Sequence, residues 1–233
     1  MKRLIDIFGS LIGLIILLPF FPFIALAIKL DTFFSVIARP ARPNDFGRSG
    51  GSPECGNLSE RFFTAFRMTP ASPVLIKLDR VSNGKIVGVY KFRSMVVGAE
   101  KQKKDLLKLN ERNDGPFFKI KNDPRITKAG RFLRRTRIDE LPQLINVLKS
   151  ELSLVGPRPH EPEELFAYPR EYRELLSAKT GLTGLSQVNG ASGLPFLKEL
   201  EYDKYYLENQ SFWFDAKILF KTLVIFLTDP TGV

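Results

Sequence analysis

The stretch RRTRIDELPQLINVL, residues 134–148, decides the interpretation of this chain, because two adjacent acids directly precede an apolar helix pattern. Apolar side chains recur every three or four residues after the acids, as in an amphipathic helix. Asp139 occupies the position of a helix N-cap, and Pro142 falls in the first turn, where its missing N–H loses no helical partner. The pattern therefore predicts a helix that begins at Asp139, with Glu140 beside it.

Asp139 has two possible uses. The positive end of the helix dipole and the basic residues upstream favour its ionised form. An ionised aspartate can attack phosphorus as a nucleophile. Ordinary helix capping explains the same residue without any chemistry, and the pair taken alone favours capping.

Cations are concentrated before this helix, since residues 119–137 carry eight Lys or Arg and a single acid, Asp123. Such a run attracts anionic substrates, although a solvated or lipid-facing surface is an equally simple explanation. The formal net charge of the chain is +10, which suits nucleic acid, anionic lipid or a phosphorylated substrate.

Two other motifs present cations on rigid backbone. Lys91 and Arg93 lie two residues apart at the end of a predicted strand and so share one face, as a phosphate clamp or as an exposed edge. Arg158 stands between two prolines that fix its backbone, which suits a phosphate partner or a simple structural turn. His160, beside this turn, is given no role.

Residues 4–28 are almost wholly apolar, with Asp6 as the only charge and basic residues on both flanks. They suit a signal peptide, a spanning helix or a helix that enters the membrane and returns. Pro19 and Pro22 break the run into pieces that are each too short to cross a core of about 30 Å. The residues alone favour a spanning helix, and the basic flanks point to the cytoplasmic side.

Elsewhere, two β-like runs, 74–78 and 86–92, flank Ser82-Asn83-Gly84 and predict a hairpin. The single Cys55 excludes an intrachain disulfide, and one His with one Cys argues against structural zinc. Residues 39–56 are rich in Gly, Pro and Ser and predict a loop. Three phenylalanines follow it, which rest on a membrane or pack against the core: Phe62, Phe63 and Phe66. Helices are expected at 99–109, 161–178, 198–209 and 212–227, the last lying along a membrane interface or in the core, and a loop at 181–193.

Taken together and in order, the motifs carry a specific resemblance. They are KFRSM (91–95), DPRIT (123–127), the stretch from Arg134 to Leu144, SLVGPRP (153–159), and GLTG (181–184) with QVNG (187–190). The chain resembles the bacterial sugar transferases, the monotopic phosphoglycosyl transferases, in their short single-domain form. The resemblance covers residues 1–31 and about 73–228.

The resemblance implies an α+β, mostly helical fold: a small catalytic domain with a short β-hairpin, an N-terminal re-entrant membrane segment and interfacial amphipathic helices. A helix broken at Pro19 reverses the preference for a spanning helix. The implied division is a membrane segment at 1–31, an atypical insertion at 32–72 and a catalytic domain at 73–233. The implied location is the bacterial inner membrane, with the catalytic domain on its cytoplasmic face and in contact with membrane lipids.

The implied reaction moves a phosphosugar from a UDP-sugar to undecaprenyl phosphate through a covalent aspartyl intermediate, with release of UMP. It would be the first membrane step of polysaccharide or glycoprotein assembly. The resemblance makes Asp139, Glu140 and Arg134 catalytic and assigns Mg²⁺ to Asp139 and Glu140. The implied substrate-binding residues are Lys91, Arg93, Arg125, Pro157, Arg158, Pro159, Gln187 and Asn189.

Two departures from the family pattern stand out. Leu18 precedes the helix-breaking proline where the family often has Ser, and about 40 residues intervene between Asp31 and the first strand. The insertion keeps a non-catalytic membrane scaffold open as a rival function. A nucleic-acid partner is not expected, because the basic run lacks interleaved aromatics. The sugar, the pathway and the oligomeric state are left open.

Overall fold

The computed structural model describes residues 1–38, 72–190 and 193–228. Most of the predicted insertion, including the Gly- and Pro-rich stretch and the three phenylalanines after it, lies outside the described residues. Within them the chain is mostly helical and contains two two-stranded sheets. The predicted fold class is therefore confirmed at this coarse level.

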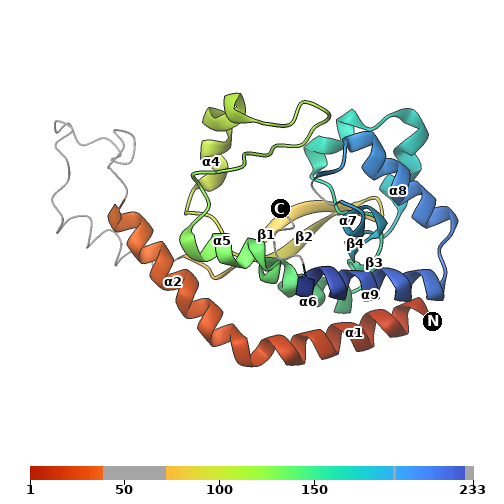
Figure 1. The fold of residues 1–233 in the computed structure, drawn as a ribbon, viewed down its shortest axis with the longest axis horizontal. Coiled ribbons are helices and arrows are strands. Elements are labelled where there is room, and N and C mark those ends of the chain that lie inside the picture. Colours follow the sequence, from red (N-terminus) through yellow and green to blue (C-terminus); the bar gives the residue numbers. More distant parts are fainter. Residues whose placement is uncertain (39–71, 191–192, 229–233) are drawn as a thin grey trace.

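The N-terminal segment is one long, bent helix. Helix α1 (Lys2–Leu17) passes through a 3₁₀ turn, η1 (Leu18–Phe20), into α2 (Phe21–Ala38), which continues past the boundary predicted at residue 31. Pro19 lies in the 3₁₀ turn, where its missing N–H interrupts the helical ladder. Figure 1 shows the two helices beneath the rest of the chain, with the bend pointing away from it. By length and composition alone, Lys2–Ser35 is apolar enough to cross a membrane.

The predicted hairpin is confirmed. Strands β1 (Leu75–Ser82) and β2 (Lys85–Phe92) pair antiparallel, with Ser82 opposite Lys85. Asn83 and Gly84 form the two-residue turn, with φ of 53° and 69°. Positive φ at both positions is what the tightest hairpin turn requires, and the Asn-Gly pair supplies it at little steric cost.

A second, parallel sheet was not predicted. Strand β3 (Ser153–Val155) pairs with β4 (Gly181–Thr183), and a short helix, α7 (Leu185–Val188), follows. The loop expected at 181–193 is therefore wrong over 181–188. A Cβ atom on Gly181 would lie 2.1 Å from the backbone nitrogen of Gly156, so the glycine is needed for the two strands to approach.

The remaining helices surround these sheets (Figure 1). The helices predicted at 198–209 and 212–227 are confirmed as α8 (Phe196–Glu208) and α9 (Phe212–Thr228). The stretches at 99–109 and 161–178 are helical but largely 3₁₀. The other elements are α4 (Ala99–Lys103), η2 (Lys104–Leu109), α5 (Lys128–Arg135), η3 (Ile138–Gln143), α6 (Leu144–Leu148), η4 (Pro162–Ala167) and η5 (Arg170–Ser177). The main core cluster comprises Val89, Leu144, Val147, Leu152, Leu154, Val155, Val188, Tyr206 and Ile218.

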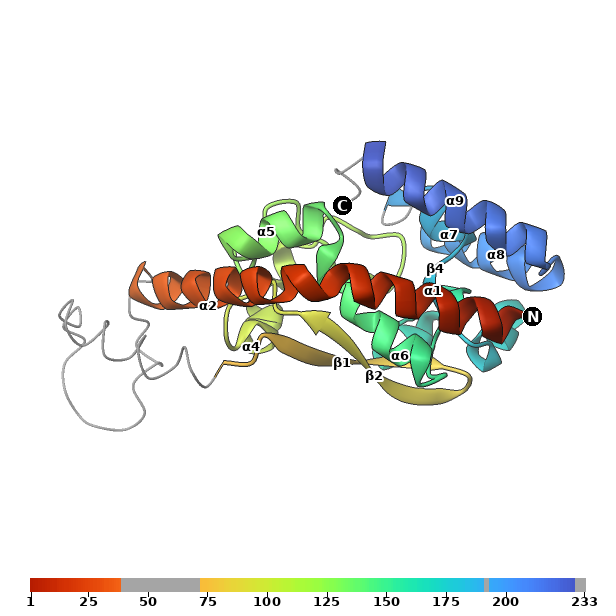
Figure 2. The ribbon, with the colours of Figure 1, turned by 90° about the horizontal axis from the view of Figure 1, so that it is seen from below.

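Polar side chains dock the start of α1 onto the domain. Asp6 is buried, and its carboxylate accepts hydrogen bonds from the Ser153 hydroxyl at 3.0 Å and the Leu154 N–H at 2.8 Å. The Arg3 guanidinium donates to two carbonyls at the C-terminal end of α6, both at 2.6 Å. The only charge within the apolar run is therefore a docking residue. Figure 2 shows α1 beside α6 along this contact.

The far end of the segment is also attached to the domain. The Lys29 ammonium donates to the Ser72 carbonyl at 2.6 Å, and the Asp31 carboxylate accepts from the Ala129 N–H of α5 at 2.6 Å. Both ends of the long helix thus contact one and the same domain, and Leu17 and Phe21 beside the bend pack with Phe92 of β2.

Candidate active site

The acid pair lies in η3, between β2, α5 and α1. The prediction that Asp139 caps an α-helix is wrong, because the 3₁₀ turn begins at Ile138 and Arg137 occupies the N-cap position. Arg137 has a φ of 55°, a left-handed conformation that is strained for a non-glycine residue. This turn reverses the chain after α5 and places both acids in the first turn of η3.

Asp139 is buried, with 6% of its surface exposed. Burial raises the pKa of its carboxyl to about 6, against the opposing charges of Lys91 and Arg134, while the Glu140 charge adds to the rise. We expected the helix terminus and the basic run to govern this group. Loss of hydration outweighs them, because a buried carboxylate gives up water that the nearby cations only partly replace.

The pKa of the Glu140 carboxyl shifts in the opposite direction to that of Asp139. Its side chain is 40% exposed and lies 2.6 Å from the Lys91 ammonium. Burial raises the pKa of the Glu140 carboxyl, but the charge and hydrogen bond of Lys91 outweigh it, with Arg158 and Arg137 adding to the fall below the usual value. Neighbouring carboxyls whose pKa values are driven apart are typical of paired roles at a site.

Backbone contacts around Ser94 bring Arg134 to the acids. The Arg134 Nε donates to the Ser94 hydroxyl at 2.9 Å, and the Thr127 N–H donates to the Ser94 carbonyl at 3.1 Å. A Cβ atom on Gly130 would lie 1.9 Å from that carbonyl oxygen, so only glycine lets α5 approach so closely. Three motifs that are separate in sequence therefore meet at one serine.

Two predicted substrate-binding arginines are engaged with the protein itself. Arg125 is 4% exposed and forms a two-pronged ion pair with Asp123, with its Nη2 2.6 Å from a carboxylate oxygen. The Arg93 Nε donates to the Pro73 carbonyl at 2.9 Å. Their role in substrate binding stays a prediction, but the geometry supports a structural one.

Two hydrogen bonds hold the backbone of the Pro157-Arg158-Pro159 turn in place. The Arg158 N–H donates to the buried Asp203 carboxylate at 3.0 Å, and the Pro157 carbonyl accepts from the Gly181 N–H at 2.8 Å. The Arg158 side chain is 35% exposed and its guanidinium lies 5.5 Å from the centre of the Phe117 ring. Its positive charge also contributes to the lowered pKa of Glu140, so the guanidinium acts on the acid pair electrostatically.

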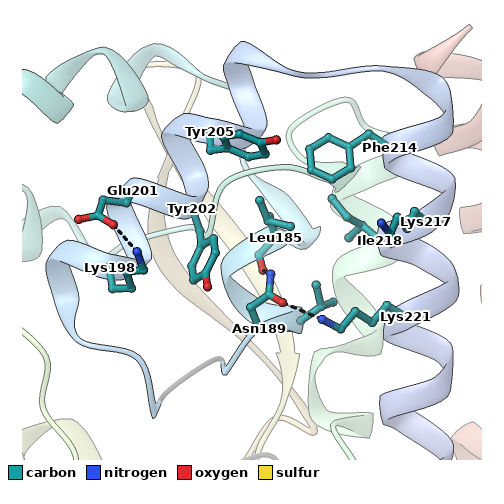
Figure 3. A pocket seen from close by; sticks show the side chains of 11 residues that line it. Leu185, Asn189, Lys198, Glu201, Tyr202, Tyr205, Phe214, Lys217, Ile218 and Lys221 are labelled. Carbon is teal, nitrogen blue, oxygen red and sulfur yellow. Dashed lines mark hydrogen bonds and ion pairs between the residues drawn. The ribbon is translucent and has the colours of Figure 1, made fainter.

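The last two predicted binding residues lie elsewhere. Among the described residues, the Gln187 amide donates a long hydrogen bond, 3.4 Å, to the Leu182 carbonyl. Asn189 lines a hollow of about 570 Å³ between α7, α8 and α9, where its carbonyl accepts from Lys221 at 2.7 Å (Figure 3). The two residues stay predictions, with Asn189 facing this lysine- and tyrosine-lined hollow.

The carboxylates can be tested for a metal by their chemistry. Within the part of the chain that the structure describes, no group of three or more His, Cys, Asp or Glu is arranged so that it could hold a metal ion by itself. Mg²⁺ is commonly held by one or two carboxylates together with substrate phosphates, and it keeps several waters. Asp139 and Glu140 therefore fit Mg²⁺ shared with a phosphorylated substrate, and not a closed protein cage.

A group of buried polar side chains next to Arg158 was not predicted from the sequence. Its members are His160, at 3% exposure, and Glu199 and Asp203, each at 1%. Burial raises the pKa of Asp203 to about 6, while its bond from Ser186 opposes the shift. A signal existed: Glu199 and Asp203 are four residues apart and share the helix face of Leu200 and Tyr206.

Comparison with known proteins supplies the last observation. The sequence model described as "Bacterial sugar transferase" matches residues 60–229, so its match begins inside the predicted insertion. The chain is 36% identical to the "Exopolysaccharide production protein PSS" of Rhizobium leguminosarum bv. phaseoli, over 100% of this chain and 98% of that protein.

Two longer relatives match in part. The "Galactosyl transferase CpsE" of Streptococcus agalactiae is 46% identical over 66% of this chain and 35% of that protein. The "Undecaprenyl-phosphate galactose phosphotransferase" of Salmonella typhimurium is 45% identical over 66% of this chain and 33% of that protein. The chain thus spans about a third of the length of these relatives.

Proposed function

Since the chain belongs to the bacterial sugar transferase family, we propose that it transfers a sugar 1-phosphate from a UDP-sugar to undecaprenyl phosphate. The observation that carries the proposal is a buried Asp139 beside a Lys91-bound Glu140, inside the region that matches the family. The names of the Salmonella relative and of an Escherichia coli relative, a "UDP-glucose:undecaprenyl-phosphate glucose-1-phosphate transferase", support this donor and acceptor.

In the first step the Asp139 carboxylate attacks the β-phosphorus of the UDP-sugar. A bond forms between its oxygen and that phosphorus, the bond to the bridging oxygen breaks, and UMP leaves. With a pKa of about 6, Asp139 is mostly ionised at neutral pH yet poorly hydrated, a combination that favours attack. Lys91 and Arg134 offset the repulsion between this carboxylate and an anionic diphosphate.

In the second step an oxygen of undecaprenyl phosphate attacks the phosphorus held on Asp139. The aspartyl bond breaks, the carboxylate is regenerated, and the lipid leaves as a diphosphate-linked sugar. Arg158, whose side chain is 35% exposed and whose charge lowers the pKa of Glu140, contacts the nucleotide in this scheme. Asp139 and Glu140 would hold Mg²⁺, which would neutralise charge on the diphosphate when bound.

The test is UMP release by the purified protein with a panel of UDP-sugars, with and without undecaprenyl phosphate. Without acceptor, a UDP-sugar labelled in the sugar should leave its label covalently on the protein. Asp139→Asn should abolish both signals by removing the nucleophile, while Asp79→Asn, an exposed aspartate on β1, should match wild type. UMP release by Asp139→Asn at the wild-type rate would exclude the aspartyl mechanism.

The proposal includes a re-entrant topology at the cytoplasmic face of the inner membrane. Lys2 and Asp6 at one end and Lys29 and Asp31 at the other bind the same domain, so a helix crossing the bilayer would have to release one end. The bend carries exposed apolar residues, with Leu18 at 72%, and points away from the domain (Figure 1). These features support a helix that enters the lipid with its bend foremost and does not cross the bilayer.

Topology is tested by cysteine labelling of intact cells with a membrane-impermeant maleimide, in a Cys55→Ser background. One cysteine is placed ahead of Met1 and another at exposed Leu30, with Asp79→Cys as the domain marker. All three should label only after the cells are opened. Labelling of the N-terminal cysteine alone in intact cells would mean that the helix spans the membrane.

A further inference from the structure

Glu199 is a buried carboxylate with an unusual environment. It lies on the inner face of α8 with 1% of its surface exposed, and neither carboxylate oxygen accepts a hydrogen bond from any described residue. Burying an ionised carboxylate without compensation is strongly unfavourable, so the charged form of Glu199 depends on cations close by.

Two cationic or polar partners face it at ion-pair distance. The Arg158 Nη1 lies 3.7 Å from one Glu199 oxygen, and the His160 Nε2 lies 3.4 Å from the other. The opposite ring nitrogen of His160 lies 3.1 Å from a Glu164 oxygen, which fixes the orientation of the imidazole. Glu164, His160, Glu199 and Arg158 thus form a row in which the buried pair His160 and Glu199 links Glu164 to the half-exposed guanidinium.

Arg158 is the member of this row that reaches the site. Its backbone is fixed by two prolines and by the bond to Asp203, and its guanidinium packs near the Phe117 ring. Within the described ranges that guanidinium donates no hydrogen bond, although it carries five N–H donors. Glu199 therefore holds the charge in place without using the donors, which remain available to a phosphate.

We infer that Glu199 is a positioning residue that holds Arg158 in the orientation in which it binds the diphosphate of the nucleotide donor. The inference rests on the proposed function. On this inference, the row from Glu164 to Arg158 determines specificity for the nucleotide end of the substrate. Asp139 carries out the attack on phosphorus.

The first experiment compares Glu199→Gln with Glu208→Gln, an exposed glutamate on the same helix. Glu199→Gln removes the charge and keeps the shape, so it should raise the KM for the UDP-sugar roughly tenfold, equivalent to about 1.4 kcal/mol, with little change in kcat. UDP affinity, measured without turnover, should weaken in parallel. Glu199→Asp, which keeps the charge, should recover part of the affinity, and Glu208→Gln should equal wild type.

A double-mutant cycle separates positioning from a structural role. In an Arg158→Ala background, Glu199→Gln should cause no further loss of UDP affinity, because the residue it positions is gone. Equal losses in both backgrounds, a fall in kcat with unchanged KM, or a wild-type KM in Glu199→Gln would each overturn the inference. A wild-type protein that releases no UMP from any UDP-sugar would instead refute the proposed function.

Discussion

Replacing Asp6 by leucine removes the charge from the apolar run and the acceptor that docks α1. The change favours membrane insertion, because an aspartate in a lipid-facing helix is unfavourable. The structure predicts the opposite effect on the folded protein. Asp6 accepts from Ser153 and Leu154, and leucine leaves both of these buried donors without a partner.

The magnitude follows from those two donors. Each buried donor that loses its acceptor costs roughly 1–3 kcal/mol, so Asp6→Leu should destabilise the fold by about 2–6 kcal/mol. For a chain of this length 1 kcal/mol corresponds to roughly 2–4 °C in Tm, so the midpoint should fall by at least about 4 °C. Asp6→Asn keeps an acceptor for the Leu154 N–H and a donor for the Ser153 hydroxyl, and should lose less than half as much.

The assay is thermal unfolding of the purified protein in lipid nanodiscs, with membrane insertion checked by fractionation. Ser153→Ala is the matching partner: it should add little destabilisation on top of Asp6→Leu, since the bond that it removes is already lost. A Tm for Asp6→Leu within about 1 °C of wild type, or an equal loss in Asp6→Asn, would refute docking by this carboxylate.

Three further changes follow from single contacts. Gly130→Ala places a methyl group 1.9 Å from the Ser94 carbonyl oxygen, so it should push α5 away and lower kcat/KM at least about tenfold, whereas Ala129→Gly should retain most activity. Asn146→Leu removes the fully buried amide that binds the Tyr90 N–H at 2.9 Å, and urea unfolding should show a loss of about 2–4 kcal/mol. Because the pKa of Asp203 is raised to about 6 from 3.8, its folded form binds a proton more tightly than its unfolded form, and stability should fall by roughly 2 kcal/mol between pH 4 and pH 6, a slope that Asp203→Asn should remove.

Local patterns were enough for the elements with strong periodicity or turn chemistry. The Asn83-Gly84 pair between two β-like runs predicted the hairpin, and the strongly apolar stretch at 212–227 predicted α9, because these signals act over short stretches of sequence. The order of the motifs was enough to identify the family. The same local signals located the acid pair at the start of a helical segment, but the N-cap that they predicted at Asp139 is occupied by Arg137.

Other features depended on contacts between distant segments. The β3–β4 pairing joins residues far apart in sequence through glycines that have no strand pattern of their own. The docking roles of Arg3 and Asp6 likewise require knowledge of what lies opposite them. In the sequence, Arg3 is part of a basic flank and Asp6 is an isolated charge, and neither pattern indicates docking.

The electrostatics of the site required the tertiary structure most of all. The sequence places Asp139, Glu140 and the basic run close together, and on that basis predicts an ionised acid. Only the fold buries Asp139, leaves Glu140 partly exposed beside Lys91, and sets Glu199 under Arg158. Hydration is lost according to what surrounds a group in space, so neighbours in sequence can identify a catalytic pair but cannot set the pKa of either member.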